Sequence, residues 1–350
     1  MAEGVTAADL DAQDQRLLTV AQAAFPLVPR PFAALARAVG LDEEETIARL
    51  AACRERRLVR RIGPVFEPAA LGLTTELVAV EVEPDATERV GSAIAAWPQV
   101  THCYLRNHRI NLWFAGAASS VHWFEQASSR VAAWDGVLGA WRLPALRRFK
   151  IGVLFDLVRD QTSSEPAVAR PAAHTPGGAR RAAGKPDVER VRVIETDLPL
   201  APAPFALLGS RLPVRGQGLL GTIREWLRRG WIRRYGAQLS HRMLGFTANA
   251  MVTWVVPSGE MEKVGSRMAS DPEVTHCYER PAFDDFPYDL YAMIHGRSRE
   301  QCLAVADRLS QACGIGEPLP LFSTREFKKS APPYSELMAA AAGHLEDRAE

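Results

Sequence analysis

The stretch Thr101-His102-Cys103-Tyr104 occurs a second time in this chain, as Thr275-His276-Cys277-Tyr278. The stretch Arg60-Arg61-Ile62-Gly63 likewise returns as Arg233-Arg234-Tyr235-Gly236. Solenoid proteins repeat units of about 20–50 residues, and this repeat is far longer. The chain is therefore predicted to contain two fused copies of one multi-element unit, which together form an internal pseudo-dimer.

The bulk composition restricts the class of protein. A chain of 350 residues is long enough for two or more domains, each with its own core. Its 42 basic and 41 acidic residues nearly cancel, so the net charge does not attract the protein to nucleic acid or to an acidic membrane. The five cysteines form no C-x-x-C pair, and no signal sequence or long apolar run is present. We expect a soluble, cytoplasmic protein with reduced thiols.

Each copy begins with the pattern of a winged helix-turn-helix. In the first copy, apolar residues recur at helical spacing over 10–24, 31–39 and 42–57. Asp42 is placed to cap the third helix, with Glu45 three residues later. A β-wing then follows through Arg60-Arg61-Ile62, which completes the helix, turn, helix and wing order.

The rest of each copy alternates strands and helices in the order βαββαβ, which predicts a ferredoxin-like domain. The fold class expected is α+β, with two tandem copies of winged helix-turn-helix plus ferredoxin-like domain. The expected strands are 77–82, 100–105, 110–115 and 139–149, then 247–256, 274–279, 290–295 and 319–327, with helices at 88–97, 119–133, 260–270 and 299–314. The predicted domains are winged helices 1–62 and 187–235, ferredoxin-like domains 63–156 and 236–330, a linker 157–186 and a tail 331–350.

The linker is predicted from its Ala, Pro, Gly, Ser and Arg content, which lacks hydrophobic periodicity. The tail belongs to neither copy. A short helix is compatible with its sequence, and we expect a solvated terminal extension.

A winged helix followed by a ferredoxin-like domain resembles the Lrp/AsnC regulators. The second copy also contains a more specific set of stretches: Arg233 to Ala237, Ser240-His241-Arg242, Leu244-Gly245-Phe246 with Asn249 and Met251, Val274 to Tyr278, and Pro287 to Gly296. Together these stretches resemble a narrower family, the siroheme decarboxylases. The resemblance covers nearly the whole chain and looks like the fused two-subunit form of haem d1 synthesis. It implies loss of CO2 from the C12 and C18 acetates of siroheme, giving 12,18-didecarboxysiroheme for haem d1 or haem.

The first copy departs from this pattern, although it keeps His102 and Tyr104. Pro68-Ala69 stands where the second copy has His241-Arg242, and Arg109 to Trp113 replaces the Pro287 to Tyr291 segment. The first half is therefore expected to be a partner and scaffold, and the second half to hold the reacting site.

The resemblance implies a cationic site for siroheme, whose eight carboxylates suit arginine forks, together with aromatic faces for the macrocycle. Histidine suits protonation of the carbanion left by CO2, with tyrosine assisting. The candidate catalytic residues are His241, His276 and Tyr278. The candidate substrate-binding residues are Arg233, Arg234, Arg242, Arg280, Tyr288, Tyr291 and His295.

Each of these candidates also has a structural interpretation. Only one of the adjacent Arg233 and Arg234 is expected to face the site, and the aromatic residues also suit a core. If His276 faces the ligand, strand alternation turns Cys277 toward the core. No cofactor is expected, because the macrocycle delocalises the charge. Iron enters with the substrate, and His276 or His241 is a candidate to ligate it.

Two other functions stay open: an Lrp/AsnC-type regulator that binds DNA and a small effector, and a non-catalytic haem carrier. A DNA-reading helix in the first copy begins Asp42-Glu43-Glu44-Glu45, which opposes a polyanion. Three glycines between Gly216 and Gly221 weaken the equivalent helix by about 1 kcal/mol each. The expected partners are siroheme and didecarboxysiroheme, without DNA or membrane. Association beyond the pseudo-dimer and the order of decarboxylation stay open.

Overall fold

The computed structural model describes residues 10–152, 154–157, 161–163, 186–212, 218–283 and 286–346. These residues form two compact units. The winged-helix unit contains the chain up to Leu71, the described part of 154–165, and the described residues up to Thr247. The sheet unit contains Gly72 to Gly152 and the described residues from Ala248 onward. Within these ranges, no helix is both long and apolar enough to cross a membrane.

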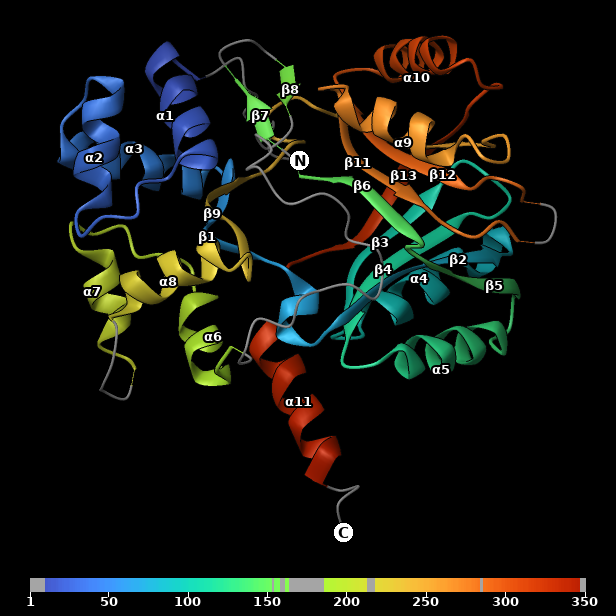
Figure 1. Cartoon of the computed structure of the whole chain (residues 1–350), viewed down its shortest axis with the longest axis horizontal. Coiled ribbons are helices and arrows are strands. Elements are labelled where there is room, and N and C mark those ends of the chain that lie inside the picture. The colour runs from blue at the N-terminus through green and yellow to red at the C-terminus, as the bar shows by residue number, and fades with distance from the viewer. Residues whose placement is uncertain are drawn as a thin grey trace. The chain divides into compact units, whose positions relative to one another are not determined.

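The winged-helix unit unites the first elements of both copies. Strand β1 (Val59–Phe66) pairs antiparallel with strand β9 (Ile232–Leu239), and the two lie side by side in Figure 1. Gly63 pairs with Gly236, its equivalent in the other copy, so a pseudo-two-fold axis passes between them. The helices of this unit are α1 (Ala12–Ala23), α2 (Pro31–Val39), α3 (Glu43–Glu55), α6 (Val188–Ile194), α7 (Pro204–Gly209) and α8 (Leu219–Arg228).

Local sequence signals account for these helix positions. The Asp42 side chain accepts a hydrogen bond from the Glu45 backbone N–H at 2.7 Å, which confirms the predicted cap of α3. The unit ends later than the predicted domain boundaries at 62 and 235. The reason is that β1 and β9 continue past those residues and pair with each other.

The sheet unit contains both βαββαβ domains, as predicted. Each domain has the strand order of a ferredoxin-like fold, β5-β2-β4-β3 in the first copy and β13-β10-β12-β11 in the second. The first copy supplies β2 (Thr74–Val82), α4 (Thr87–Ala95), β3 (Val100–Arg106), β4 (Leu112–Ala118), α5 (Val121–Ala132), β5 (Val137–Pro144) and β6 (Arg147–Ile151). The second supplies β10 (Ala248–Trp254), α9 (Met261–Ser270), β11 (Val274–Glu279), β12 (Leu290–Gly296), α10 (Arg299–Cys313) and β13 (Leu319–Lys329).

The last strand of each copy crosses to the other copy. In the first copy, β6 continues from β5 and pairs with β11, while β13 pairs with both β10 and β3. The crossing strands also carry equivalent rings. Phe149 lies against Gly265, and Phe327 lies against Gly91, where an added Cβ would be 2.3 Å and 2.5 Å from the ring atoms. Reciprocal strand exchange therefore joins the two copies within this unit.

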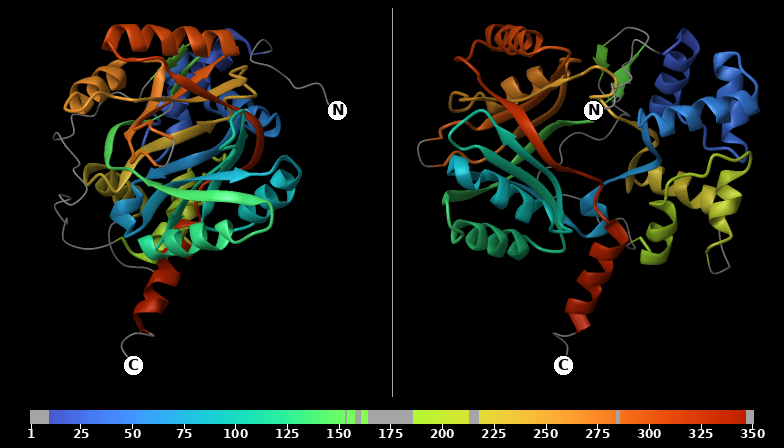
Figure 2. Two further views of the ribbon diagram at one scale, coloured as in Figure 1. Left: turned by 90° about the vertical axis from the view of Figure 1, so that its right-hand side faces the viewer. Right: turned by 180° about the vertical axis from the view of Figure 1, so that it is seen from behind.

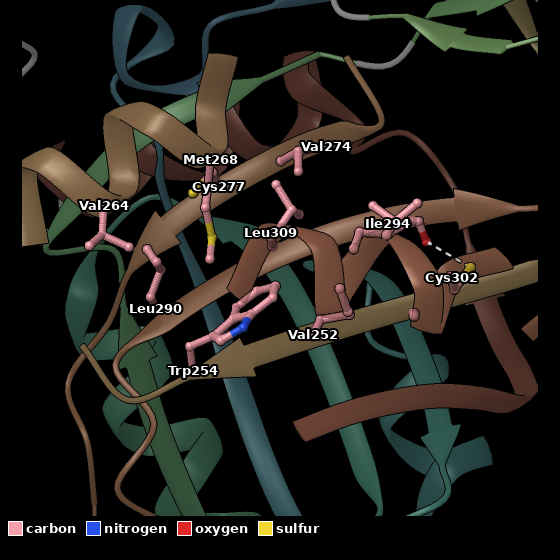
Figure 3. Packing of buried hydrophobic residues seen from close by; sticks show 14 of the residues in the cluster. Val252, Trp254, Val264, Met268, Val274, Cys277, Leu290, Ile294, Cys302 and Leu309 are labelled. Atoms are coloured by element: carbon pink, nitrogen blue, oxygen red, sulfur yellow. Dashed lines mark hydrogen bonds between the residues drawn. The ribbon is translucent and has the colours of Figure 1, made fainter. Parts of the chain in front are cut away.

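Helices cover the outer faces of the strands, with α9 and α10 on one side and α4 and α5 on the other (Figure 2). On the second copy's outer side, Trp254, Met268, Leu309 and their neighbours form one buried cluster (Figure 3). The inner faces of the two copies share a third cluster. Its buried members are Ala79, Ile110, Trp113, Leu143, Met251, Phe286, Tyr291 and Leu321.

Two expectations about the connecting segments need correction. The predicted linker lies mainly outside the described residues, but Gln161–Ser163 at its start forms strand β8, which pairs with β7 (Leu154–Asp156). The predicted solvated tail contains helix α11 (Tyr334–Glu346), and its Tyr334, Leu337 and Met338 are buried. An apolar helical face drives that burial, which composition alone did not indicate.

Candidate active site

Strand β11 presents a column of polar side chains to the inner face of the sheet unit. His276 is the cross-strand partner of Met293, and Tyr278 is the partner of Tyr291, both of which belong to the inner cluster or pack on it. Cys277 points the other way, and its Sγ lies 3.9 Å from the Gly265 carbonyl oxygen. Burial raises the pKa of Cys277 to about 12, so this thiol is core rather than nucleophile. The predicted alternation is confirmed.

A β-bulge at Thr275 fixes the orientation of His276. The register shifts between Val274 and His276, and the Thr275 hydroxyl donates to the Met293 carbonyl oxygen at 3.1 Å. That hydroxyl also lies 3.2 Å from His276 Nδ1. Because its one proton is already donated, it accepts from Nδ1–H, which makes Nε2 the unprotonated nitrogen of the neutral imidazole. Bulges of this kind commonly orient side chains at functional sites.

Arg280 lies at the end of this column, between two tyrosine rings. Its guanidinium carbon is 4.9 Å from the centre of the Tyr278 ring and 5.9 Å from that of Tyr291. One Nη donates to the Leu143 carbonyl oxygen, and Nε is buried without a hydrogen-bond partner among the described residues. Burial lowers the pKa of Arg280, against the smaller opposing effects of Tyr278, Tyr291 and Glu76. Among the described residues, this buried cation therefore has no salt-bridge partner, and Glu76, the carboxylate that acts on its pKa, is itself paired with Arg142.

Tyr291 adds a second incomplete polar group beside Arg280. Its side chain is buried, and its Oη has no hydrogen-bond partner among the described residues. Burial raises the pKa of Tyr291, so the phenol remains a neutral donor at physiological pH. Buried donors of this kind are costly unless a ligand or water satisfies them.

The first copy repeats the same column almost atom for atom. His102 Nδ1 lies 2.9 Å from the Thr101 hydroxyl, which donates to the Ala115 carbonyl oxygen. Arg106 lies over the Tyr104 ring and donates to the Leu321 carbonyl oxygen at 2.6 Å. Burial lowers the pKa of Arg106 to about 10. The His–Tyr–Arg column therefore does not by itself distinguish the two copies.

The neighbouring strand distinguishes the two copies. Strand β12 presents Tyr291, Met293 and His295 to the inner face, whereas β4 presents Trp113, Ala115 and Ala117 at the equivalent positions. The Trp113 indole donates to the Ile110 carbonyl oxygen at 2.8 Å, so it needs no ligand. Only the second copy combines the column with an unsatisfied hydroxyl on this strand, among the residues that the structure describes.

The hairpin that follows Arg280 is largely aromatic core. Phe283 stacks on Trp141 with ring centres 4.9 Å apart, and Phe286 is buried against Trp113 and Tyr288. These contacts support the expectation that aromatic residues of the second copy form part of a hydrophobic core. Tyr288 is half-buried at the edge of the cluster, with its ring 4.8 Å from that of Phe286.

The predicted arginines of the wing belong to the winged-helix unit. Arg234 donates to the carbonyl oxygens of Gln22 and Ala237 at 2.6 Å and 3.2 Å. Its first-copy equivalent, Arg61, makes the same two kinds of contact. Arg233 donates through Nε to a carbonyl oxygen of β1, and Arg242 is exposed in a turn. The contacts of Arg234 join α1 to the wing.

His241 also belongs to the winged-helix unit. It is 5% exposed, and its ring stacks on Phe155 at 6.4 Å with an interplanar angle of 15°. Phe155 is held in turn by Gln22, whose amide bonds both the N–H and the carbonyl oxygen of Phe155. Sequence reasoning missed Phe155 because it lies beside the predicted linker, where no periodicity marks it as buried.

Across the described ranges, no group of three or more His, Cys, Asp or Glu side chains is arranged to hold a metal ion.

Comparison with known proteins relates these features to a family. The siroheme decarboxylase NirDL-like HTH domain family matches residues 14–60, and the AsnC-like ligand binding domain family matches residues 70–150 and 243–328. A siroheme decarboxylase of Hydrogenobacter thermophilus is 33% identical, covering 90% of this chain and 92% of that protein. The siroheme decarboxylase NirDL subunit of Paracoccus denitrificans is 34% identical, covering 94% and 99%.

A solved structure agrees with these sequence matches. The crystal structure of the siroheme decarboxylase NirDL in co-complex with an iron-uroporphyrin III analogue has a TM-score of 0.65 and 28% identity. The match covers 97% of this chain and all of that one.

Proposed function

The chain belongs to the siroheme decarboxylase family, and on that basis we propose that its second copy removes CO2 from the C12 and C18 acetates of siroheme. The product is then 12,18-didecarboxysiroheme. One observation supports the second copy as the place of the reaction. Tyr291 Oη is a buried donor without a hydrogen-bond partner among the described residues, and it lies on the same inner face as His276. A polyanionic macrocycle supplies the carboxylates that such donors need.

The proposed chemistry uses three side chains of the inner face. Arg280 and Tyr291 bind carboxylate oxygens and hold the acetate so that its C–COO bond stands out of the ring plane. When that bond breaks, CO2 leaves and its electron pair is delocalised into the macrocycle. One proton then adds to the methylene carbon and converts it to a methyl group. No cofactor beyond the substrate's own ring is needed for this step.

His276 is the proposed proton donor. In its protonated form, Nδ1–H donates to the Thr275 hydroxyl, and Nε2–H is the proton that is transferred. Because Thr275 is anchored to the Met293 carbonyl oxygen, the ring keeps one orientation through both states. The mechanism therefore requires the bulge as well as the imidazole.

The test is anaerobic incubation of the purified chain with siroheme in D2O, followed by mass spectrometry. The expected product has lost two CO2 and carries one deuterium in each new methyl group. His276→Ala should keep siroheme binding and lose most turnover, while the matched His102→Ala variant stays near the wild-type rate. Unchanged siroheme in the wild-type reaction would refute the function. Equal loss in both variants would refute the choice of the second copy.

His241 remains a predicted catalytic residue, and its variant is measured in the same assay. Loss of turnover in His241→Ala with retained siroheme binding supports a role in proton transfer. Wild-type turnover in that variant removes the residue from the mechanism.

We also propose that the winged helices do not read DNA. The first turn of α3 carries three glutamates, two of which already bind arginines of the same domain. Glu43 pairs with Arg30, and Glu45 pairs with Arg49. An acidic helix start repels phosphate. Fluorescence anisotropy with promoter fragments should show only weak binding that moderate salt abolishes, and salt-resistant binding would contradict the proposal.

A further inference from the structure

We propose that Asn249, together with His295, is the specificity-determining pair that binds a substrate carboxylate arm in the second copy. This inference rests on the proposed function and extends it to a residue outside the His–Tyr–Arg column. It also explains why two copies with the same column are not equivalent.

Strand β10 places Asn249 on the inner face. Ala248, Ala250 and Val252 point to the helices and belong to the outer cluster, whereas Met251 belongs to the inner cluster. Asn249 alternates with the first group and shares the face of Met251. Its cross-strand partner on β12 is His295, so the two side chains are neighbours on the inner face.

The amide of Asn249 is incompletely bonded. The residue is 9% exposed, and its Oδ1 has no hydrogen-bond partner among the described residues. An amide presents an acceptor at one end and two N–H donors at the other, and a half turn exchanges them. Turned with Nδ2 toward the inner face, it donates to a carboxylate without adding charge.

The spacing on the sheet fits one extended ligand. His276 is paired with Met293, so His295 is its diagonal neighbour, about 7–8 Å away. Asn249 lies one strand further, about 4.8 Å beyond His295. A tetrapyrrole with carboxylate arms around its rim extends over that distance. His276 therefore serves the reacting arm while Asn249 and His295 hold another.

The first copy lacks this pair entirely. Thr75 and Ala117 occupy the positions equivalent to Asn249 and His295, and they too are cross-strand partners. A methyl group at Ala117 cannot donate or accept, and the Thr75 side chain is shorter than an amide. The two copies thus share the column and differ at the pair.

The test compares Asn249→Leu with Asn249→Asp, measuring siroheme Kd by absorbance titration at pH 8. The leucine removes the donor and is expected to raise Kd about tenfold. The aspartate keeps the shape but repels a carboxylate, so its Kd should exceed that of the leucine variant. Matched substitutions at Thr75, to Leu and to Asp, should leave Kd within twofold of wild type.

Which of the two variants has the higher Kd distinguishes a binding role of Asn249 from a purely structural role, and this comparison holds even if both substitutions lower Tm. A purely structural Asn249 predicts equal Kd in both variants, and that result overturns the proposal, as does a wild-type Kd in both. His295→Ala combined with Asn249→Leu should weaken binding less than the product of the single effects, because both bind one arm. Wild-type protein that binds siroheme without releasing CO2 would refute the proposed reaction and leave this binding test intact.

Discussion

Replacing Arg280 by methionine tests whether this buried cation binds the substrate. Methionine roughly matches the length of the side chain and removes both the charge and the unpartnered Nε. A hydrogen bond to a charged group contributes about 1.5–3 kcal/mol. At about 1.4 kcal/mol per tenfold change, the Kd for siroheme should rise roughly 10- to 150-fold.

The same change should alter stability much less. The variant loses the bond from Arg280 to the Leu143 carbonyl oxygen, which costs about 1 kcal/mol. It also removes a desolvated cation that has no salt-bridge partner among the described residues, which offsets a similar amount. We expect a net change within about 1 kcal/mol, or roughly 2–4 °C in Tm for a domain of this size.

Arg106→Met is the matched control, since Arg106 bonds the Leu321 carbonyl oxygen just as Arg280 bonds that of Leu143. Absorbance titration with siroheme gives Kd, and thermal unfolding gives Tm. Arg106→Met should shift Tm by a similar amount and leave Kd within about threefold of wild type. Equal Kd values for the two variants would refute the proposal that Arg280 binds the substrate, because both arginines would then only stabilise the fold through their hydrogen bonds.

Two further variants test the packing and the electrostatics of the sheet unit. Gly265→Ala should lower unfolding stability by about 1–3 kcal/mol, because its Cβ would lie 2.3 Å from the Phe149 ring; unchanged Tm in a thermal melt would contradict this. Burial works to raise the pKa of Asp271, but the hydrogen bonds from Arg308 and the Glu273 backbone N–H, together with the charges of Arg308 and Lys150, outweigh burial and lower that pKa. This stabilisation is present above the unfolded pKa of about 3.9 and lost as pH falls through the folded value. Arg308→Leu should therefore lower the free energy of unfolding by about 1 kcal/mol or less at pH 7, since Arg308 is half-exposed. Near pH 2 the same substitution should leave the free energy of unfolding, measured with urea, unchanged. An equal loss at both pH values would contradict the ion pair.

The local elements could be predicted because their causes lie within a few residues. The cap at Asp42 and the apolar spacing behind it fix α3, and strand alternation fixes Cys277 as core opposite His276. The repeat itself predicted that both copies share the winged-helix and βαββαβ order. These features depend on periods of two and 3.6 residues, which a sequence displays directly.

The role of each candidate side chain depended on contacts between residues far apart in the chain. Arg234 is a predicted carboxylate ligand, and its guanidinium also donates to the carbonyl oxygen of Gln22, 212 residues away in the chain. No sequence pattern marks Phe155 as part of a site, yet its ring stacks on that of His241, which lies far from it in the sequence. Neither contact follows from local spacing.

The sequence by itself determined the duplication, the fold class and the family of this protein, because periodicity and motif order are local and survive divergence. Only the tertiary structure showed that each of the two copies has its own column of His, Tyr and Arg side chains. It also showed that the Tyr291 hydroxyl and Asn249 Oδ1 are buried on the second copy's inner face without a hydrogen-bond partner among the described residues. Whether a buried polar atom is satisfied depends on which distant strands and loops surround it, and that becomes known only when the sheet is assembled.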